Sequence, residues 1–66
     1  MLGTKMYTFL KVAEYLNFTK AAEALYMTQP AVSQQIKQLE EEVGVKVFIR
    51  NKNGLILTQQ GEIVLK

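Results

Sequence analysis

One edge of the segment 28–44 carries the side chains best suited to recognition chemistry in this sequence. At about 100° per residue, the edge opposite the apolar residues of that segment carries Pro30, Ser33, Gln34, Lys37 and Glu41. The N-terminal half of this edge offers amide, hydroxyl and ammonium groups and no carboxylate, because the acidic residues of the segment begin at Glu40. Such an edge meets the requirements for reading base edges in a major groove of DNA. The alternative is an ordinary amphipathic helix whose polar face is only solvated.

Catalysis and metal binding find no support in the composition. The chain contains no Cys and no His, so the usual nucleophile–base pairs and zinc ligands are missing. Glu40, Glu41 and Glu42 are consecutive, so on a helix their carboxylates point in different directions instead of converging. No glycine-rich phosphate loop is present. We therefore expect a protein that is not an enzyme, with no catalytic residue, no metal site and no cofactor.

The recognition edge must be positioned by a helix that occupies most of the segment 28–44. Thr28 is a good N-cap, Pro30 is tolerated only in a first turn, and Gly44 suits a left-handed C-terminal residue. The apolar residues recur at the helical period and are predicted to face inward: Val32, Ile36, Leu39 and Val43.

Two earlier helices are predicted from the same kinds of signal. Thr4 can cap a helix to about Asn17, with one apolar face made of Met6, Phe9, Leu10, Ala13 and Leu16. Thr19 can cap a short second helix, and Phe18 is expected to plug the core. The inward residues of that helix are Ala21, Ala22 and Leu25. Because only about three residues separate it from Thr28, the pair is predicted to form a helix-turn-helix.

A β-hairpin is predicted after Gly44. The runs 45–49 and 55–58 are rich in β-branched and aromatic residues, and the basic segment 50–54 between them ends in Asn-Gly. An isolated hairpin is marginal in water, so Val47, Ile49 and Leu57 are expected to pack on the helices. Thr58 can cap a further helix that is barely started at Lys66. We therefore expect the natural polypeptide to continue.

The composition is that of one small domain. Sixty-six residues, 48% of them hydrophobic, can form a single core. The formal net charge is only +2, but residues 43–61 hold Lys46, Arg50 and Lys52 and no acid. No apolar run is long enough to cross a membrane, and the first residues do not form a signal peptide. A soluble cytoplasmic protein is expected.

The order of these features resembles the N-terminal domain of the LysR-type bacterial transcriptional regulators. The residues that carry the resemblance are FTKAAEALYMTQPAVSQQIKQLEEEVGVKVFIR, followed by LTQQGE. They match, in order and spacing, nearly every element of the family pattern, which includes a paired Ala, Ser/Thr-Gln-Pro-Ala, Leu-Glu, Phe-x-Arg and Leu-Thr-x-x-Gly. The resemblance covers almost the whole chain. It implies a mainly α fold, a winged helix-turn-helix with a three-helix core, a two-stranded wing and the start of a fourth helix.

The resemblance also implies which residues meet double-stranded operator DNA. The helix at about 29–43 would enter the major groove, and the wing at about 50–54 would reach the adjacent minor groove. The residues expected to contact bases are Gln29, Pro30, Ser33 and Gln34. Those expected to contact the backbone are Thr19, Lys20, Thr28, Lys37 and Arg50, and those of the wing tip are Lys52 and Asn53.

Structural alternatives stand beside these roles. Thr19 and Thr28 are also capping candidates, Gln29 and Pro30 also fit a plain helix start, and the wing tip also fits a solvated loop. Lys5 and Lys11 are either phosphate contacts or, more commonly for such residues, solvated charges. Two departures from the family lower the local charge, since Arg is frequent both where Gln34 stands and at the wing tip. Gln34 favours pairing with adenine over guanine.

Residues 1–58 are expected to form the DNA-binding domain and residues 59–66 the start of a linker and dimerisation helix. The resemblance implies a homodimer or higher homo-oligomer of the full-length protein, and a small-molecule effector bound only by a C-terminal domain that this chain lacks. A protein-interaction module is the main rival, because winged helices can also bind protein partners. Steep salt dependence of DNA binding would discriminate between the two.

Overall fold

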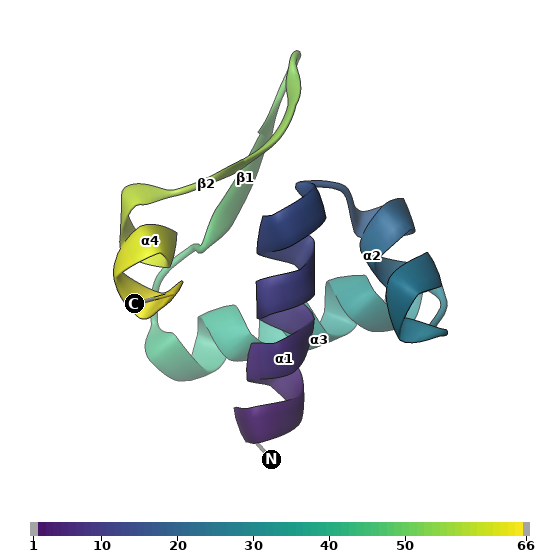
Figure 1. The fold of residues 1–66 in the computed structure, drawn as a ribbon. Helices are drawn as coiled ribbons and strands as arrows, with labels where there is room; N and C mark the ends of the chain where they lie inside the picture. Colours follow the sequence, from purple (N-terminus) through teal and green to yellow (C-terminus); the bar gives the residue numbers. More distant parts are fainter. Residues whose placement is uncertain (1, 66) are drawn as a thin grey trace.

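The computed structural model describes residues 2–65 and has four helices and one two-stranded sheet. In chain order the elements are α1 (Leu2–Tyr15), α2 (Phe18–Leu25), α3 (Gln29–Val43), β1 (Phe48–Asn51), β2 (Gly54–Leu57) and α4 (Gln59–Leu65). Helices α1, α2 and α3 pack together, and the hairpin rises from the end of α3 as a wing (Figure 1). The predicted fold class, a mainly α winged helix-turn-helix, is confirmed.

Helix α1 supplies the centre of the core through a face that only partly matches the predicted one: Met6, Phe9 and Ala13 pack in or against the core, as predicted. Phe9 and Val12 are fully buried, whereas Leu10 and Leu16 are exposed. Thr4 does not cap the helix, because the helix already includes Leu2, and the Thr4 carbonyl instead accepts a hydrogen bond from the Thr8 hydroxyl. The buried Thr8 hydroxyl also lies 2.5 Å from the side-chain oxygen of Gln35 on α3, so its polarity is satisfied.

Helix α2 begins one residue after its cap, and the cap is not the one predicted. The Asn17 side chain accepts a hydrogen bond from the Lys20 N–H at 2.9 Å, so Thr19 lies inside the first turn and is not the N-cap. Ala21 and Ala22 are buried, as predicted, and their small side chains allow α2 to approach the other helices closely. Tyr26 ends the helix in the left-handed conformation, with φ 56°.

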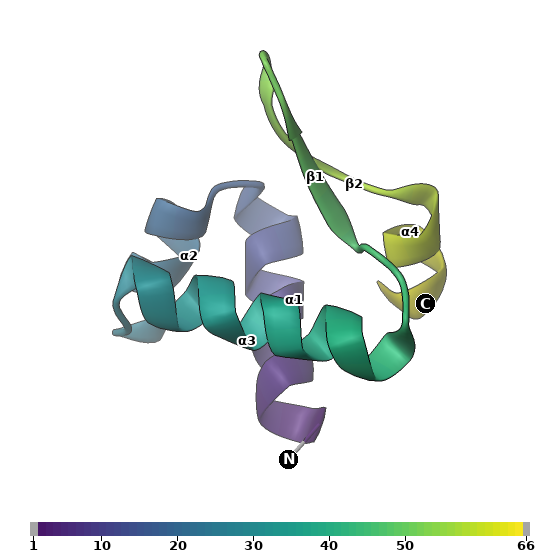
Figure 2. The same ribbon diagram turned by 180° about the vertical axis from the view of Figure 1, so that it is seen from behind.

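Helix α3 agrees closely with the prediction. The Thr28 hydroxyl oxygen accepts from the Ala31 N–H at 3.3 Å, Pro30 lies in the first turn, and Gly44 ends the helix with φ 80°. Val32, Ile36 and Leu39 are buried, but Val43 is exposed, because the core does not extend to the last turn. Figure 2 shows α3 across one face of the molecule, with α1 crossing steeply behind it.

The wing is an antiparallel hairpin in which Phe48 pairs with Leu57 and Arg50 pairs with Leu55. Directly opposite residues lie on the same face of a sheet, so Phe48, Leu57, Arg50 and Leu55 share one face. Phe48 is buried on that face, and its ring makes edge contacts with the rings of Phe9 and Phe18. These contacts anchor the wing to the helices, and Phe18 packs against the core as predicted.

The strand assignment differs from the prediction at both ends. β1 begins at Phe48, so Val45, Lys46 and Val47 precede the sheet, and Val47 is buried there. Ile49, expected to pack on the helices, is 46% exposed because it alternates with Phe48 and faces away from the core. The turn is centred on Lys52 and Asn53, where no positive φ occurs, and Gly54 follows at φ 119°.

Helix α4 starts where the chain leaves the wing. As predicted, the Thr58 hydroxyl oxygen caps it, accepting from the Gly61 N–H at 2.8 Å. Gly61 is buried against Val47, and a Cβ there would collide with the Val47 carbonyl oxygen, so only glycine fits this crossing. Val64 packs on the core, which the sequence did not indicate, whereas Ile63 is exposed. Within residues 2–65, none of the helices combines the length and apolarity needed to cross a lipid bilayer.

Candidate nucleic-acid interface

Within residues 2–65, the side chains on the outer edge of α3 make no hydrogen bond or ion pair. Pro30, Gln34 and Lys37 are exposed, and Gln29 and Ser33 are half-buried. The next residue, Gln35, turns inward to Thr8, so the two adjacent glutamines have opposite roles. The predicted orientation of the helix is therefore confirmed, with its valine–isoleucine–leucine edge inside and its Ser33–Gln34 edge outside.

Two hollows flank this edge and bring predicted site residues from different elements together. The first, of about 510 Å³, lies between the start of α2, the start of α3 and the wing, and Thr19, Gln29 and Arg50 line it. The second, of about 250 Å³, lies between α3 and β1, and Ser33, Lys37 and Arg50 line it. Arg50 therefore links the two hollows. In Figure 2, α3 and β1 are both seen on this side of the molecule.

Arg50 lies within β1 and not in the turn where the sequence placed it. Its guanidinium carbon is 5.1 Å from the centre of the Phe18 ring, in a cation–π arrangement. Phe18 itself packs against Phe48 and the core. A planar cation on a fixed ring is held in place at small entropic cost, and its remaining N–H groups can donate to a phosphate.

The cations of the chain fall into two groups by their partners. Lys5 pairs with Glu42 at 2.8 Å, Lys11 with Glu14 at 3.4 Å, and Lys46 with Glu40 at 3.7 Å. Across residues 2–65, the lysines and arginines without an ion pair are Lys20, Lys37, Arg50 and Lys52. These are the basic residues that the sequence analysis assigned to DNA.

The pairing of Lys5 and Lys11 bears on their two alternative roles. Glu14 raises the pKa of Lys11 above its ordinary value, mainly through the side-chain hydrogen bond and then through its negative charge. A lysine held by a neighbouring carboxylate must break that contact to reach a phosphate. The geometry thus favours an intramolecular role for Lys5 and Lys11.

The remaining predicted backbone and wing-tip residues lie outside the two hollows. Lys20, Thr28, Lys52 and Asn53 are all exposed. The oxygen of Thr28 already accepts from Ala31, although its hydroxyl hydrogen is left to donate. At the wing tip, the Asn51 side chain accepts from the Asn53 N–H at 2.9 Å, which orders the turn.

Three residues near the site were not singled out from the sequence. Asn17 lines the first hollow, and Lys46 and Glu40 line the second. Asn17 could have been found as an N-cap, since Asn precedes the new helical period there. Glu40 had no comparable signal, because its partners are backbone N–H groups beyond the end of α3.

A three-helix core with a hairpin wing, and with a polar α3 edge that has no hydrogen bond or ion pair within residues 2–65, defines the chain as a winged helix-turn-helix domain. Residues 4–62 match the family model described as "Bacterial regulatory helix-turn-helix protein, lysR family". The chain belongs to this family. The resemblance given on sequence motifs is thereby confirmed.

Proteins of similar sequence include transcriptional regulators of Bacillus subtilis. The HTH-type transcriptional regulator AlsR of Bacillus subtilis (strain 168) is 61% identical over 57 residues, covering 86% of this chain and 19% of that protein. The uncharacterized HTH-type transcriptional regulator YvbU of the same strain is 51% identical over 66 residues, covering 98% of this chain and 23% of that protein. The chain thus spans about a fifth of the length of these relatives.

Solved structures share the fold. A LysR-family transcriptional regulator from Eggerthella lenta DSM 2243 superposes with a TM-score of 0.91 at 45% identity, over 97% of this chain and 91% of that one. The CbnR DNA-binding domain in a DNA complex superposes with a TM-score of 0.88 at 34% identity, over 94% of this chain and 71% of that one.

Proposed function

We propose that the chain is the operator-reading domain of a LysR-type transcriptional regulator and binds double-stranded DNA sequence-specifically. The observation that supports this most is the acid-free N-terminal half of the α3 edge, which is accompanied by cations that have no ion pair within residues 2–65. The CbnR DNA-binding domain was crystallised in complex with DNA, which supports DNA binding by this chain. The proposed activity is binding and not catalysis, in keeping with relatives that are named as transcriptional regulators.

In this proposal α3 lies in the major groove with its N-terminal half against the bases. Gln34, the exposed amide, pairs bidentately with adenine, and Ser33 donates or accepts beside it. Pro30 offers an apolar surface to a thymine methyl group, and Gln29 reaches bases from the first turn. These four residues lie along the outer edge of one helix, within the length that a major groove admits.

Phosphate contacts then fix the helix in register without reading sequence. Lys37 and Arg50 bind a phosphate on one side of the groove, which their common position at the hollow between α3 and β1 supports. Thr19 and Lys20 at the start of α2, and Thr28 at the start of α3, act at helix N-termini, where backbone N–H groups favour anions. Lys52 and Asn53, at the wing tip, contact the neighbouring minor groove.

The same proposal extends to the longer protein. Residues 1–58 form the DNA-binding domain, and residues 59–66 begin the linker helix through which two copies associate. Ile63, exposed on α4, is available for such a contact. A small-molecule effector acts only through a C-terminal domain outside this chain. A cytoplasmic location follows from the role, since bacterial DNA lies there.

The test is selection from random duplex DNA followed by affinity measurements over a range of salt concentrations. We expect an enriched sequence, tighter binding to it than to a scrambled duplex, and a steep fall in affinity with salt. The sequence preference measures the contacts with bases, and the dependence of affinity on salt measures the contacts with phosphates. No measurable DNA binding, even by a longer dimeric form, would contradict the proposal and favour a protein partner.

A further inference from the structure

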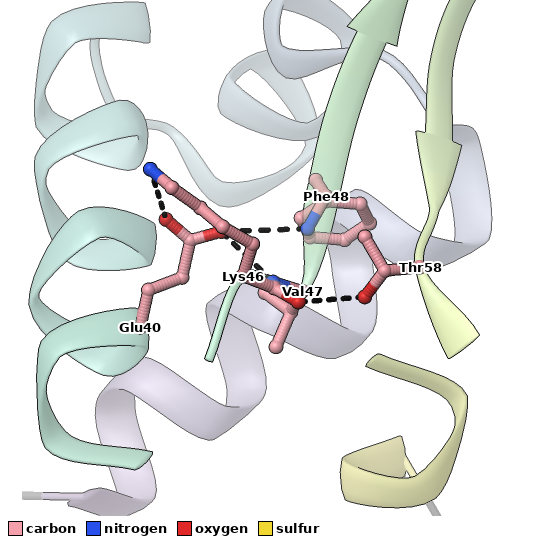
Figure 3. Close-up of polar contacts among 5 residues, drawn as sticks. All are labelled: Glu40, Lys46, Val47, Phe48 and Thr58. Atoms are coloured by element: carbon pink, nitrogen blue, oxygen red, sulfur yellow. Dashed lines mark hydrogen bonds and ion pairs between the residues drawn. The ribbon is translucent and has the colours of Figure 1, made fainter. Parts of the chain in front are cut away.

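The short segment that joins α3 to the wing is held by a buried carboxylate. The Glu40 side chain, only 13% exposed, comes from α3, and one of its oxygens accepts from the Val47 N–H at 2.9 Å and the Phe48 N–H at 3.4 Å. Its other oxygen lies 3.7 Å from the Lys46 ammonium. Figure 3 shows Glu40 reaching from α3 across to the start of β1.

The opposite side of the same segment is held by the start of α4. The Val47 carbonyl accepts from the Thr58 N–H at 2.9 Å, and the Lys46 carbonyl accepts from the Thr58 hydroxyl at 2.6 Å. The segment is therefore bonded to α3 through the N–H groups of Val47 and Phe48. It is bonded to Thr58, the residue before α4, through the carbonyl groups of Lys46 and Val47 (Figure 3). The wing leaves the helical core from this doubly held segment.

We propose that Glu40 is a positioning residue that fixes the angle of the wing relative to α3. The value of a fixed wing angle rests on the proposed function, because α3 in the major groove and the wing in the minor groove can bind together only at a fixed distance from each other. Charge-assisted hydrogen bonds to backbone N–H groups are stronger than neutral ones, which suits a carboxylate for this position. The effect on DNA is exerted through the wing, since Glu40 itself need not touch the duplex.

The variants separate the acceptor oxygen from size and charge. Glu40→Met keeps the length and helix preference of the side chain and removes both acceptors. Glu40→Gln keeps one acceptor oxygen for the two N–H groups. Glu41→Met is the matched control, because Glu41 is exposed on the next helix position and has no hydrogen bond or ion pair within residues 2–65.

Wing position is measured directly by the distance between two spin labels, at Glu23→Cys on α2 and Asn53→Cys at the wing tip. The chain has no natural cysteine, so only these positions are labelled. We expect a narrow distance distribution in the chain with native Glu40, in Glu41→Met and in Glu40→Gln, and a broadened or shifted one in Glu40→Met. A distribution in Glu40→Met as narrow as the native one, at the same mean, would overturn the proposal. So would equal broadening in Glu40→Gln and Glu40→Met.

Two further measurements separate the failure modes. Amide hydrogen exchange can be measured on the native chain without any variant. Exchange of the Val47 N–H as fast as that of an exposed loop would also refute the positioning role of Glu40. In DNA binding, Lys52→Ala should lower the salt slope by about 1 when Glu40 is present and leave it unchanged in the Glu40→Met background. Absence of DNA binding by the native chain would contradict the proposed function. The distance and exchange measurements would still decide the role of Glu40.

Discussion

The two halves of α3 have opposite relations to the rest of the chain. In the N-terminal half, the outer side chains of Ser33, Gln34 and Lys37 have no hydrogen bond or ion pair within residues 2–65. In the C-terminal half, Glu40 binds the backbone at the start of the wing and Glu42 pairs with Lys5 of α1. The outer edge is therefore free for a ligand in the N-terminal half, whereas in the C-terminal half outer side chains bond to the rest of the chain.

This division explains an unfavourable feature of the sequence. Carboxylates near the C-terminus of a helix oppose its dipole and, in a DNA-binding protein, repel phosphate. Glu40 and Glu42 are offset here by specific partners, Lys46 and Lys5, and by the N–H groups of Val47 and Phe48. The acids thus neutralise cations that are not needed at the proposed interface and leave Lys37 and Arg50 unpaired.

The largest expected effect is on the anchored side of the helix. Leu39 is fully buried, so Leu39→Ala should lower the free energy of unfolding by about 2–5 kcal/mol through lost transfer energy and a new cavity. Urea or thermal unfolding measures this. Gln34→Ala, on the free half, should stay within about 0.5 kcal/mol of the native value. Equal losses at the two positions would abolish the distinction between the buried side of α3 and its free outer edge.

The next effect belongs to the free half and appears only in binding. Gln34→Ala should weaken binding to the selected duplex by about 1–3 kcal/mol and relax specificity at one base position. Gln60→Ala, an exposed glutamine on α4, is the matched control and should leave affinity unchanged. Equal loss on selected and scrambled DNA would remove Gln34 from the base-reading residues.

The turn that leads into the free half is strained. Tyr26 has φ 56° and is 98% exposed, so its side chain gains almost nothing from packing while its backbone conformation is unfavourable for a bulky residue. Tyr26→Asn should raise the free energy of unfolding by up to about 1 kcal/mol, because Asn tolerates the left-handed region better. Thermal unfolding measures the gain, and a loss of stability would show that the phenol ring makes a contact that outweighs the strain.

The smallest effect is expected at the ion pair between Glu42, in the C-terminal half of α3, and Lys5 of α1. Glu42→Gln should lower the free energy of unfolding by less than about 1 kcal/mol, since Glu42 is partly exposed and its pair with Lys5 is screened. The loss should shrink further at high salt. A loss as large as that of Leu39→Ala would mean that the pair is a main anchor of α3.

Much of this architecture follows from local signals in the sequence. The bounds of α3 were predictable because Thr28, Pro30 and Gly44 each have a local preference that the fold does not oppose. The start of α1 was not, since a threonine caps only where the preceding chain leaves the helix, and here residues 2 and 3 continue it. Thr19 was displaced as a cap by Asn17, two residues earlier, for the same reason.

The wing shows the limit of pattern reading. Alternation alone cannot assign the phase of a short strand, so Ile49 was placed inside although Phe48 occupies that side. The polar edge of the site was visible in the helical period of α3. The Glu40 contacts with Val47 and Phe48 were not, because they depend on how the chain turns after Gly44, which no local preference determines.

The most direct test of the account compares two lysines by the salt dependence of DNA binding. Lys37 lies on the α3 edge and has no ion pair within residues 2–65, whereas Lys11 pairs with Glu14 on α1. Lys37→Ala should reduce the slope of log affinity against log salt by about 1, on selected and scrambled duplexes alike, and Lys11→Ala should leave it unchanged. An unchanged slope for Lys37→Ala, or an equal reduction for both variants, would contradict the placement of DNA on the α3 face.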